Sequence, residues 1–192
     1  TSDVRAIIFN VFENLGTMLI NNHTETTKNL KVKDKTIISQ LGIRIGAKYF
    51  FMPNLLKKFP MELNAILWKV FNKFELSENF PLPLDGRVSF ERLINMPESY
   101  WAAIGYKYLD GFAVRIDVFE RIFFLARQKI KYGPFLESSD MMNPVGCNSD
   151  QLEKILKFCG FESLAIEDNK KLYFFKTKKQ KESIVKKATK NK

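Results

Sequence analysis

The chain has 192 residues, a mass of 22.4 kDa and a formal net charge of +10. Its content of 45% hydrophobic and 14% aromatic residues is enough to build a core, which excludes a chain that is disordered throughout. No apolar run approaches the roughly 18 residues that a membrane-spanning helix needs, so we expect no membrane partner.

The N-terminus and the cysteines bear on the origin of the chain and its compartment. The first residues have neither an initiating methionine nor a signal-peptide pattern, so we expect a piece of a longer protein. Two cysteines and one histidine are too few for a structural zinc site, which needs four ligands. Nothing demands an oxidising compartment, and we place the protein in the cytoplasm.

Most of the positive charge lies at the C-terminal end. From Lys176 onward there are eight lysines and one glutamate, which leaves the body of the chain only mildly basic. Such a segment is either a solvated, disordered tail or a contact for nucleic acid, and both readings stay open.

Residues 1–79 predict a mainly helical region. Ser2 is a suitable N-cap, and apolar residues recur at helical spacing until Gly16. Helices are predicted at 3–15, 34–41, 55–59 and 61–74, and β-leaning runs at 43–46 and 49–51. The helix at 61–74 carries a strong apolar stripe formed by Leu63, Ile66, Leu67, Val70 and Phe71.

Residues 80–116 predict a connector followed by a short helix and a hairpin. Residues 80–83 read Phe-Pro-Leu-Pro and should be extended, because a residue before proline avoids the α region. A short helix is predicted at 97–103. Asp110-Gly111 between alternating apolar residues predicts a tight β-hairpin.

Residues 117–176 predict a winged-helix-like module. The expected order is a helix at 117–130, a strand at 135–136, a short helix at 139–143, a helix at 149–159 ended by Gly160, and two strands within 161–175. The fold class is therefore α+β and mainly helical, with an N-terminal helical part, small β-hairpins and this module. Residues 177–192 would form a disordered lysine-rich tail.

The motifs of common catalytic sites are missing from the sequence. It contains no phosphate-binding G-x-x-x-x-G-K-[ST] loop and no G-x-S-x-G motif, and its single histidine, His23, falls in a predicted surface loop. Asp117 and Glu120 share a helix face, but Arg115 and Arg121 are close in sequence. We interpret the two carboxylates as a helix cap and a surface ion pair.

Four strings, in this order and spacing, resemble one family. They are LGIRIGAKYFFMPNLLKK (41–58), FPLPLDGRVSF (80–90), GYKYLDGFAVRIDVFERIFFLAR (105–127) and MMNPVGCNSDQLEKILKFCGF (141–161). Together with residues 4–16 they look like the region after the motor in alphaproteobacterial ATP-dependent superfamily-two helicases, relatives of the mitochondrial degradosome RNA helicase. The family's Walker and DExH motifs match nothing in this chain, so its catalytic residues are not carried over.

The resemblance implies a non-catalytic C-terminal region of an ATP-dependent RNA or DNA helicase. Such a region would pack on the motor domains of the same parent chain and assist binding of nucleic acid, with RNA favoured. ATP and Mg²⁺ would belong to the parent motor, and no cofactor is expected in this segment. Whether this chain is part of an enzyme therefore depends on the parent protein.

The alternative is a free-standing winged-helix regulator that reads duplex DNA. Its recognition helix would present two acids and two lysines and no arginine, a poor match to a phosphate-lined groove. The candidate nucleic-acid contacts are the wing and tail lysines and two arginines on β-like segments: Lys170, Lys171, Lys176, Lys178, Lys179, Lys181, Arg44 and Arg115. No metal or catalytic residue is proposed.

Overall fold

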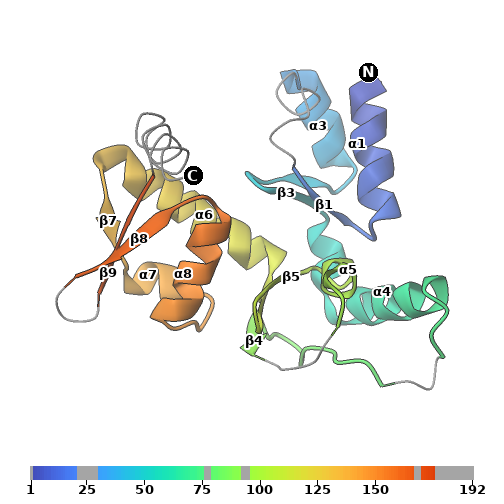
Figure 1. Cartoon of the computed structure of the whole chain (residues 1–192). Helices are drawn as coiled ribbons and strands as arrows, with labels where there is room; N and C mark the ends of the chain where they lie inside the picture. The colour runs from blue at the N-terminus through green and yellow to red at the C-terminus, as the bar shows by residue number, and fades with distance from the viewer. Residues whose placement is uncertain (1, 21–29, 76–78, 92–95, 167–169, 176–192) are drawn as a thin grey trace, which may run out of the picture. The chain divides into compact units, whose positions relative to one another are not determined.

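The computed structural model describes residues 2–20, 30–75, 79–91, 96–166 and 170–175 (Figure 1). The described residues form an α+β fold that is mainly helical, with small antiparallel sheets, as the sequence predicts. The chain divides into two compact units, residues 1–122 and 123–192, and the helix α6 (Ile116–Lys129) contains the boundary.

The N-terminal unit begins with a small sheet and two helices packed on one apolar core. Strands β1 (Thr17–Leu19), β3 (Tyr49–Phe51) and β2 (Arg44–Ile45) pair antiparallel in that order. Helices α1 (Ser2–Glu13) and α3 (Val32–Gln40) contribute apolar side chains to the core. The buried residues of this core are Val4, Ile7, Val11, Leu30, Ile38, Ile43 and Phe50.

The second core of this unit is aromatic. A 3₁₀ turn, η1 (Pro53–Leu56), leads into α4 (Lys58–Phe71). After the connector come β4 (Ser89–Glu91), α5 (Glu98–Ala103), β5 (Tyr106–Leu109) and β6 (Phe112–Arg115), with sheet order β4-β6-β5. Trp68, Tyr100 and Trp101 are buried between α4, α5 and this sheet.

The buried side-chain amide of Asn64 ties α4 to the ends of two other helices of the N-terminal unit. Its Nδ2 donates to the carbonyl of Leu15 at 3.0 Å and to that of Ala103 at 3.1 Å. These carbonyls lie after the end of α1 and at the end of α5, where helices leave acceptors unpaired. The amide N–H groups of this buried polar residue on the inner face of α4 therefore have hydrogen-bond acceptors.

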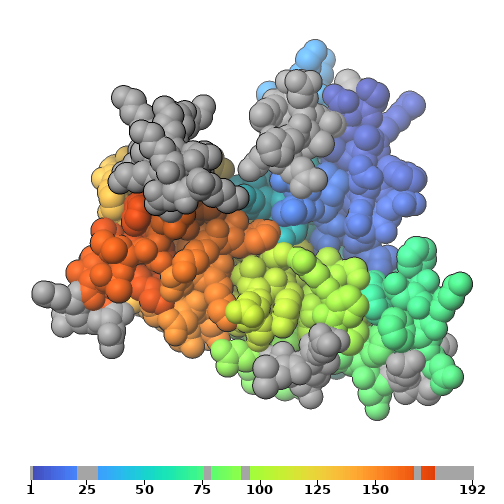
Figure 2. All heavy atoms as spheres, viewed as in Figure 1, coloured from blue at the N-terminus to red at the C-terminus, as the bar shows by residue number. Residues whose placement is uncertain are grey.

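The apolar stripe predicted on α4 does not face a core of the N-terminal unit. Its five members are between 44% and 85% exposed, and Met61, Asn64, Ala65 and Trp68 occupy the inner face. The segment of α4 lies at the surface in the space-filling view (Figure 2). The helix is apolar on two faces, so periodicity alone could not tell which one is buried.

Three predicted turns have the expected geometry. Asp110 and Gly111 have φ of 43° and 81°, as a type I′ hairpin turn requires, and they join β5 to β6 in the expected register. Gly160 has φ of 95°, and its N–H donates to the Lys157 carbonyl at 2.9 Å. Gly42 ends α3 in the same way.

The C-terminal unit has the order of elements that the sequence predicts. After α6 and η2 (Ile130–Tyr132) come β7 (Phe135–Leu136), α7 (Ser139–Met142), α8 (Ser149–Phe158), β8 (Glu162–Ala165) and β9 (Lys171–Phe174). The three strands pair antiparallel in the order β7-β9-β8. Asn148 and Gln151 form a reciprocal capping box at the start of α8.

The interpretation of Glu120 as a surface residue is wrong. Its carboxylate is 8% exposed and accepts backbone N–H bonds from Ala47, Lys48 and Tyr49, each at 2.7 Å. The turn between β2 and β3 therefore supplies three donors to a residue of α6. Asp117 does not cap the helix as predicted, because α6 begins at Ile116; its carboxylate lies in the first turn and pairs with Arg115.

Candidate nucleic-acid interface

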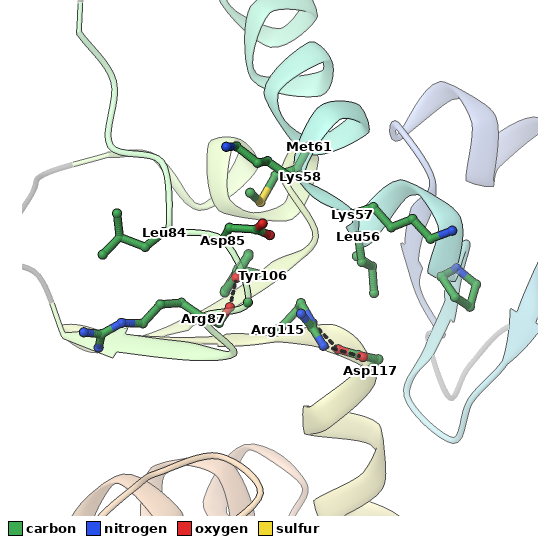
Figure 3. Close-up of a pocket in the computed structure, with 12 residues that line it drawn as sticks. Leu56, Lys57, Lys58, Met61, Leu84, Asp85, Arg87, Tyr106, Arg115 and Asp117 are labelled. Carbon is green, nitrogen blue, oxygen red and sulfur yellow. Dashed lines mark hydrogen bonds and ion pairs between the residues drawn. The ribbon is translucent and has the colours of Figure 1, made fainter.

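The start of α4 forms one wall of a hollow of about 260 Å³ in the N-terminal unit (Figure 3). We call it the α4 hollow. Its lining contains four basic side chains and two acidic ones: Lys57, Lys58, Arg87, Arg115, Asp85 and Asp117. The floor and rim also include Pro53, Leu56, Met61 and Leu84.

Lys57 and Lys58 reach this hollow because the chain changes direction between η1 and α4. Lys57 has extended backbone (φ −80°, ψ 159°) and is the N-cap residue of α4. Pro60 follows in the first helical turn, where its missing N–H costs no hydrogen bond. Both lysines are exposed, and Figure 3 shows their side chains on different sides of the hollow.

Arg87 is positioned by a turn and by a buried tyrosine. The Arg87 N–H donates to the Leu84 carbonyl at 3.0 Å, and Gly86 between them has φ of 75°. The Tyr106 hydroxyl donates to the Arg87 carbonyl at 2.5 Å. Burial raises the pKa of Tyr106 to about 12, so the hydroxyl keeps its proton and remains a donor. The Arg87 side chain itself is exposed.

Arg115 is held in place by Asp117. Arg115 Nε donates to Asp117 Oδ1 at 2.7 Å, and Nη2 donates to Oδ2 at 3.0 Å. This two-point contact fixes the plane of the guanidinium and neutralises much of its charge. Arg115 therefore shapes the α4 hollow, while Lys57, Lys58 and Arg87 supply most of its positive charge.

A second hollow, of about 480 Å³, adjoins the first. We call it the β2 hollow; its lining is Lys35, Ser39, Gly42, Ile43, Arg44, Ile45, Pro53 and Asn54. Pro53 belongs to both linings. Lys35 and Arg44 are exposed, and among the described residues no acidic side chain lines this hollow.

The C-terminal unit uses its basic residues differently. Lys171 Nζ lies 2.5 Å from Asp150 Oδ1 and 2.6 Å from Glu153 Oε2, both on α8. Lys157 Nζ lies 2.6 Å from Glu153 Oε1. Hydrogen bonds from Lys157, Lys171 and Ser163 lower the pKa of Glu153 to about 2. The two ion pairs of Lys171 tie β9 to α8.

The predicted contact residues are therefore divided between the two units. Arg44 and Arg115 line adjoining hollows in the N-terminal unit. Lys170 is exposed in the C-terminal unit, and Lys171 is engaged by α8. The predicted tail contacts Lys176, Lys178, Lys179 and Lys181 lie outside the described residues.

Four cations of the hollows were missed in the sequence: Lys35, Lys57, Lys58 and Arg87. The Lys57-Lys58 doublet, within the helix predicted at 55–59, was a usable signal. Arg87 carried none, because the other basic residues of the hollow are far from it in sequence.

Comparisons of the chain with family models, curated proteins and solved structures found no match. Within the described ranges, no helix combines the length and apolar character that crossing a membrane requires. Over the same residues, no group of three or more His, Cys, Asp or Glu side chains is arranged to hold a metal ion.

Proposed function

We propose that this chain is a non-catalytic C-terminal region of an ATP-dependent helicase acting on RNA or DNA. It would assist the binding of nucleic acid and pack on the motor domains of the same parent protein. ATP and Mg²⁺ would bind to the motor, since the sequence here has no element that cradles a triphosphate.

The observation that carries this proposal is the basic lining of the two adjoining hollows. Among the described residues, the two linings together contain six cationic side chains and two carboxylates. One of these carboxylates, that of Asp117, is already paired with Arg115. Exposed lysine and arginine side chains bind phosphates by releasing condensed counterions, and such contacts give affinity without reading sequence. An accessory region that holds a strand for a motor needs this kind of binding.

The C-terminal unit also favours an accessory region over a sequence-reading regulator. Its elements follow the order that we predicted from the sequence for a winged-helix-like module. However, the two acids of α8 are bound by Lys171 and Lys157, and the helix carries no arginine. A reader of the major groove most often contacts guanine through arginine, and Gln151, which could contact adenine, is buried in the capping box of α8.

The test is binding to a labelled, mixed-sequence RNA, and to the DNA of the same sequence, at several salt concentrations. The triple variant Lys57→Ala, Lys58→Ala, Arg87→Ala should bind more weakly to every sequence. If all three cations meet phosphates of a single strand, the slope of log K against log salt should become shallower by about 2.

A control variant removes the same charge elsewhere. Arg5, Arg121 and Lys131 are exposed and line neither hollow, and their replacement by alanine should leave the slope nearly unchanged. Equal losses in both triple variants would show that net charge alone governs binding. No binding by the unaltered chain to either nucleic acid would refute the proposal.

A further inference from the structure

We infer that the ligand of these hollows is a single strand, whose backbone runs through the β2 hollow, across Pro53 and into the α4 hollow. This inference rests on the proposed function and specifies its ligand. Duplex nucleic acid is the competing ligand, and the experiment below separates the two.

The first argument is the arrangement of the charges. Lys35 and Arg44 line one hollow, Lys57 and Lys58 the other, and Pro53 lies in the lining of both. In Figure 3 the Arg87 guanidinium points away from Arg115, so the cations of the α4 hollow do not converge on one point. A small anion is best held by converging donors, whereas cations spread along a path suit a linear polyanion.

The second argument is size. The hollows have volumes of about 260 and 480 Å³. Pockets that enclose one small molecule span roughly 300–1,000 Å³. The β2 hollow lies within this range and can take a group about as large as a nucleotide, while the α4 hollow lies just below it and suits a smaller part of a strand, such as a phosphate with its sugar. A duplex presents two base-paired strands as one stiff body, and no single nucleotide of it can enter a hollow unless it leaves the stack.

The third argument is the apolar part of the lining. Pro53, Leu56, Met61 and Leu84 lie among the cations of the α4 hollow, and Leu84 is 72% exposed. In the β2 hollow the half-buried Ile45 lies among the cations. The faces of bases are free to make apolar contacts in a single strand and are covered by stacking in a duplex. Mixed basic and apolar lining therefore favours the single strand.

Asn54 offers a direct test of the path. It lies next to Pro53, lines the β2 hollow and is exposed, so a charged side chain there should be tolerated by the fold. Asn54→Glu places a negative charge beside the proposed strand and should weaken single-strand binding about tenfold. Asn54→Arg should strengthen it. The matched control is Asn10→Glu on the exposed side of α1, which should change affinity less than twofold.

The experiment measures the affinity of the full chain and of these variants for a single-stranded 12-nucleotide RNA and for the blunt duplex of the same sequence. The unaltered chain should prefer the single strand at least tenfold, and the Asn54 variants should change single-strand affinity in opposite directions. Circular dichroism and melting midpoints confirm that each variant is folded.

Two results would overturn the inference while leaving the proposed function intact. One is equal affinity for duplex and single strand, and the other is single-strand affinity that does not respond to the charge at Asn54. Loss of binding to every nucleic acid tested would instead refute the proposed function itself.

Discussion

Among single residues, Glu120 makes the most consequential contact between distant parts of the sequence. Its two carboxylate oxygens accept three backbone N–H bonds from residues that lie 71 to 73 positions earlier. Burial raises the pKa of Glu120, and the three backbone hydrogen bonds act in the opposite direction. Gly46 begins this turn, and a Cβ there would overlap the Glu120 carboxyl group. Glycine is therefore required next to the carboxylate for steric reasons.

We predict that Glu120→Gln destabilises the protein. The amide keeps one acceptor oxygen, but its NH₂ group would face a backbone N–H that now lacks an acceptor. An unsatisfied buried donor costs about 1–3 kcal/mol in free energy of unfolding. Chemical denaturation of the variant measures this loss, with Glu13→Gln on the exposed surface of α1 as the control. Equal stability of the two variants would show that the Glu120 contacts contribute little.

Comparing Glu120 with the predicted turns explains which residues could be assigned the correct structural role from the sequence. The turns at Asp110-Gly111 and Gly160 were predicted because their positive φ angles favour particular residue types, which can be recognised from a few adjacent residues. Glu120 was misassigned because its partners are distant, and a nearby Arg121 offered a simpler local explanation. The same reasoning applies to Arg87, whose place in the α4 hollow depends on the Tyr106 hydroxyl.

Among the elements, α4 shows where periodicity fails. The helix has two apolar faces, and tertiary contacts with α5 and with the end of α1 decide which one is buried. Strand β1 shows a related failure, because three residues with no alternation become a strand only through pairing with β3. By contrast, the elements of the C-terminal unit were predicted in full order, since each carries its own start or stop signal.

We predict opposite responses on the two faces of α4. The double variant Leu63→Lys, Val70→Lys alters side chains that are 55% and 58% exposed. Its unfolding free energy should therefore stay within about 0.5 kcal/mol of the original. Trp68→Ala removes a side chain that is 7% exposed and should cost about 3–5 kcal/mol. Urea denaturation measures both. A large loss in the lysine variant would mean that the outer face is covered in solution.

The link between α8 and β9 makes stability depend on pH. The pKa of Glu153 is lowered from 4.5 to about 2 in the folded chain by hydrogen bonds from Lys157, Lys171 and Ser163. Because the folded-state pKa is depressed, the stabilisation is fully present above the unfolded value of 4.5. It is lost progressively as the pH falls from there towards 2.

We therefore predict that Glu153→Gln lowers the melting midpoint at neutral pH and that the difference from the original chain shrinks in acid. Melting curves of both proteins from neutral pH down to about pH 3 measure this convergence. Asn10→Gln, at an exposed and uncharged position of α1, is the control and should change the melting midpoint equally little at every pH. A constant difference between the Glu153 variant and the original chain across the range would exclude the ion-pair explanation.

For the whole molecule, the nucleic-acid site stays a prediction, and the sequence located only part of the basic lining that the fold brings together. Net charge and the resemblance pointed to nucleic acid, and Arg44 and Arg115 are in the linings of the hollows. The largest concentration of lysine, however, follows residue 175, outside the described residues. The basic lining at Pro53 could not be predicted, because it combines α3, β2, α4 and the turn before β4, which only the fold brings together.

The last prediction separates the two sources of positive charge. Deleting residues 177–192 removes seven lysines and one glutamate. If these lysines contact phosphates, affinity for any single strand should fall about equally whatever its sequence, and the salt slope should become shallower by up to about 5. The preference for single strand over duplex should survive the deletion, because in our proposal it arises from the hollows.

Binding titrations of the full and truncated chains at several salt concentrations, with both ligands, measure these quantities. Equal affinities and slopes for the two chains would show that the tail makes no contact, and a lost preference would place the single-strand selectivity in the tail instead of the hollows.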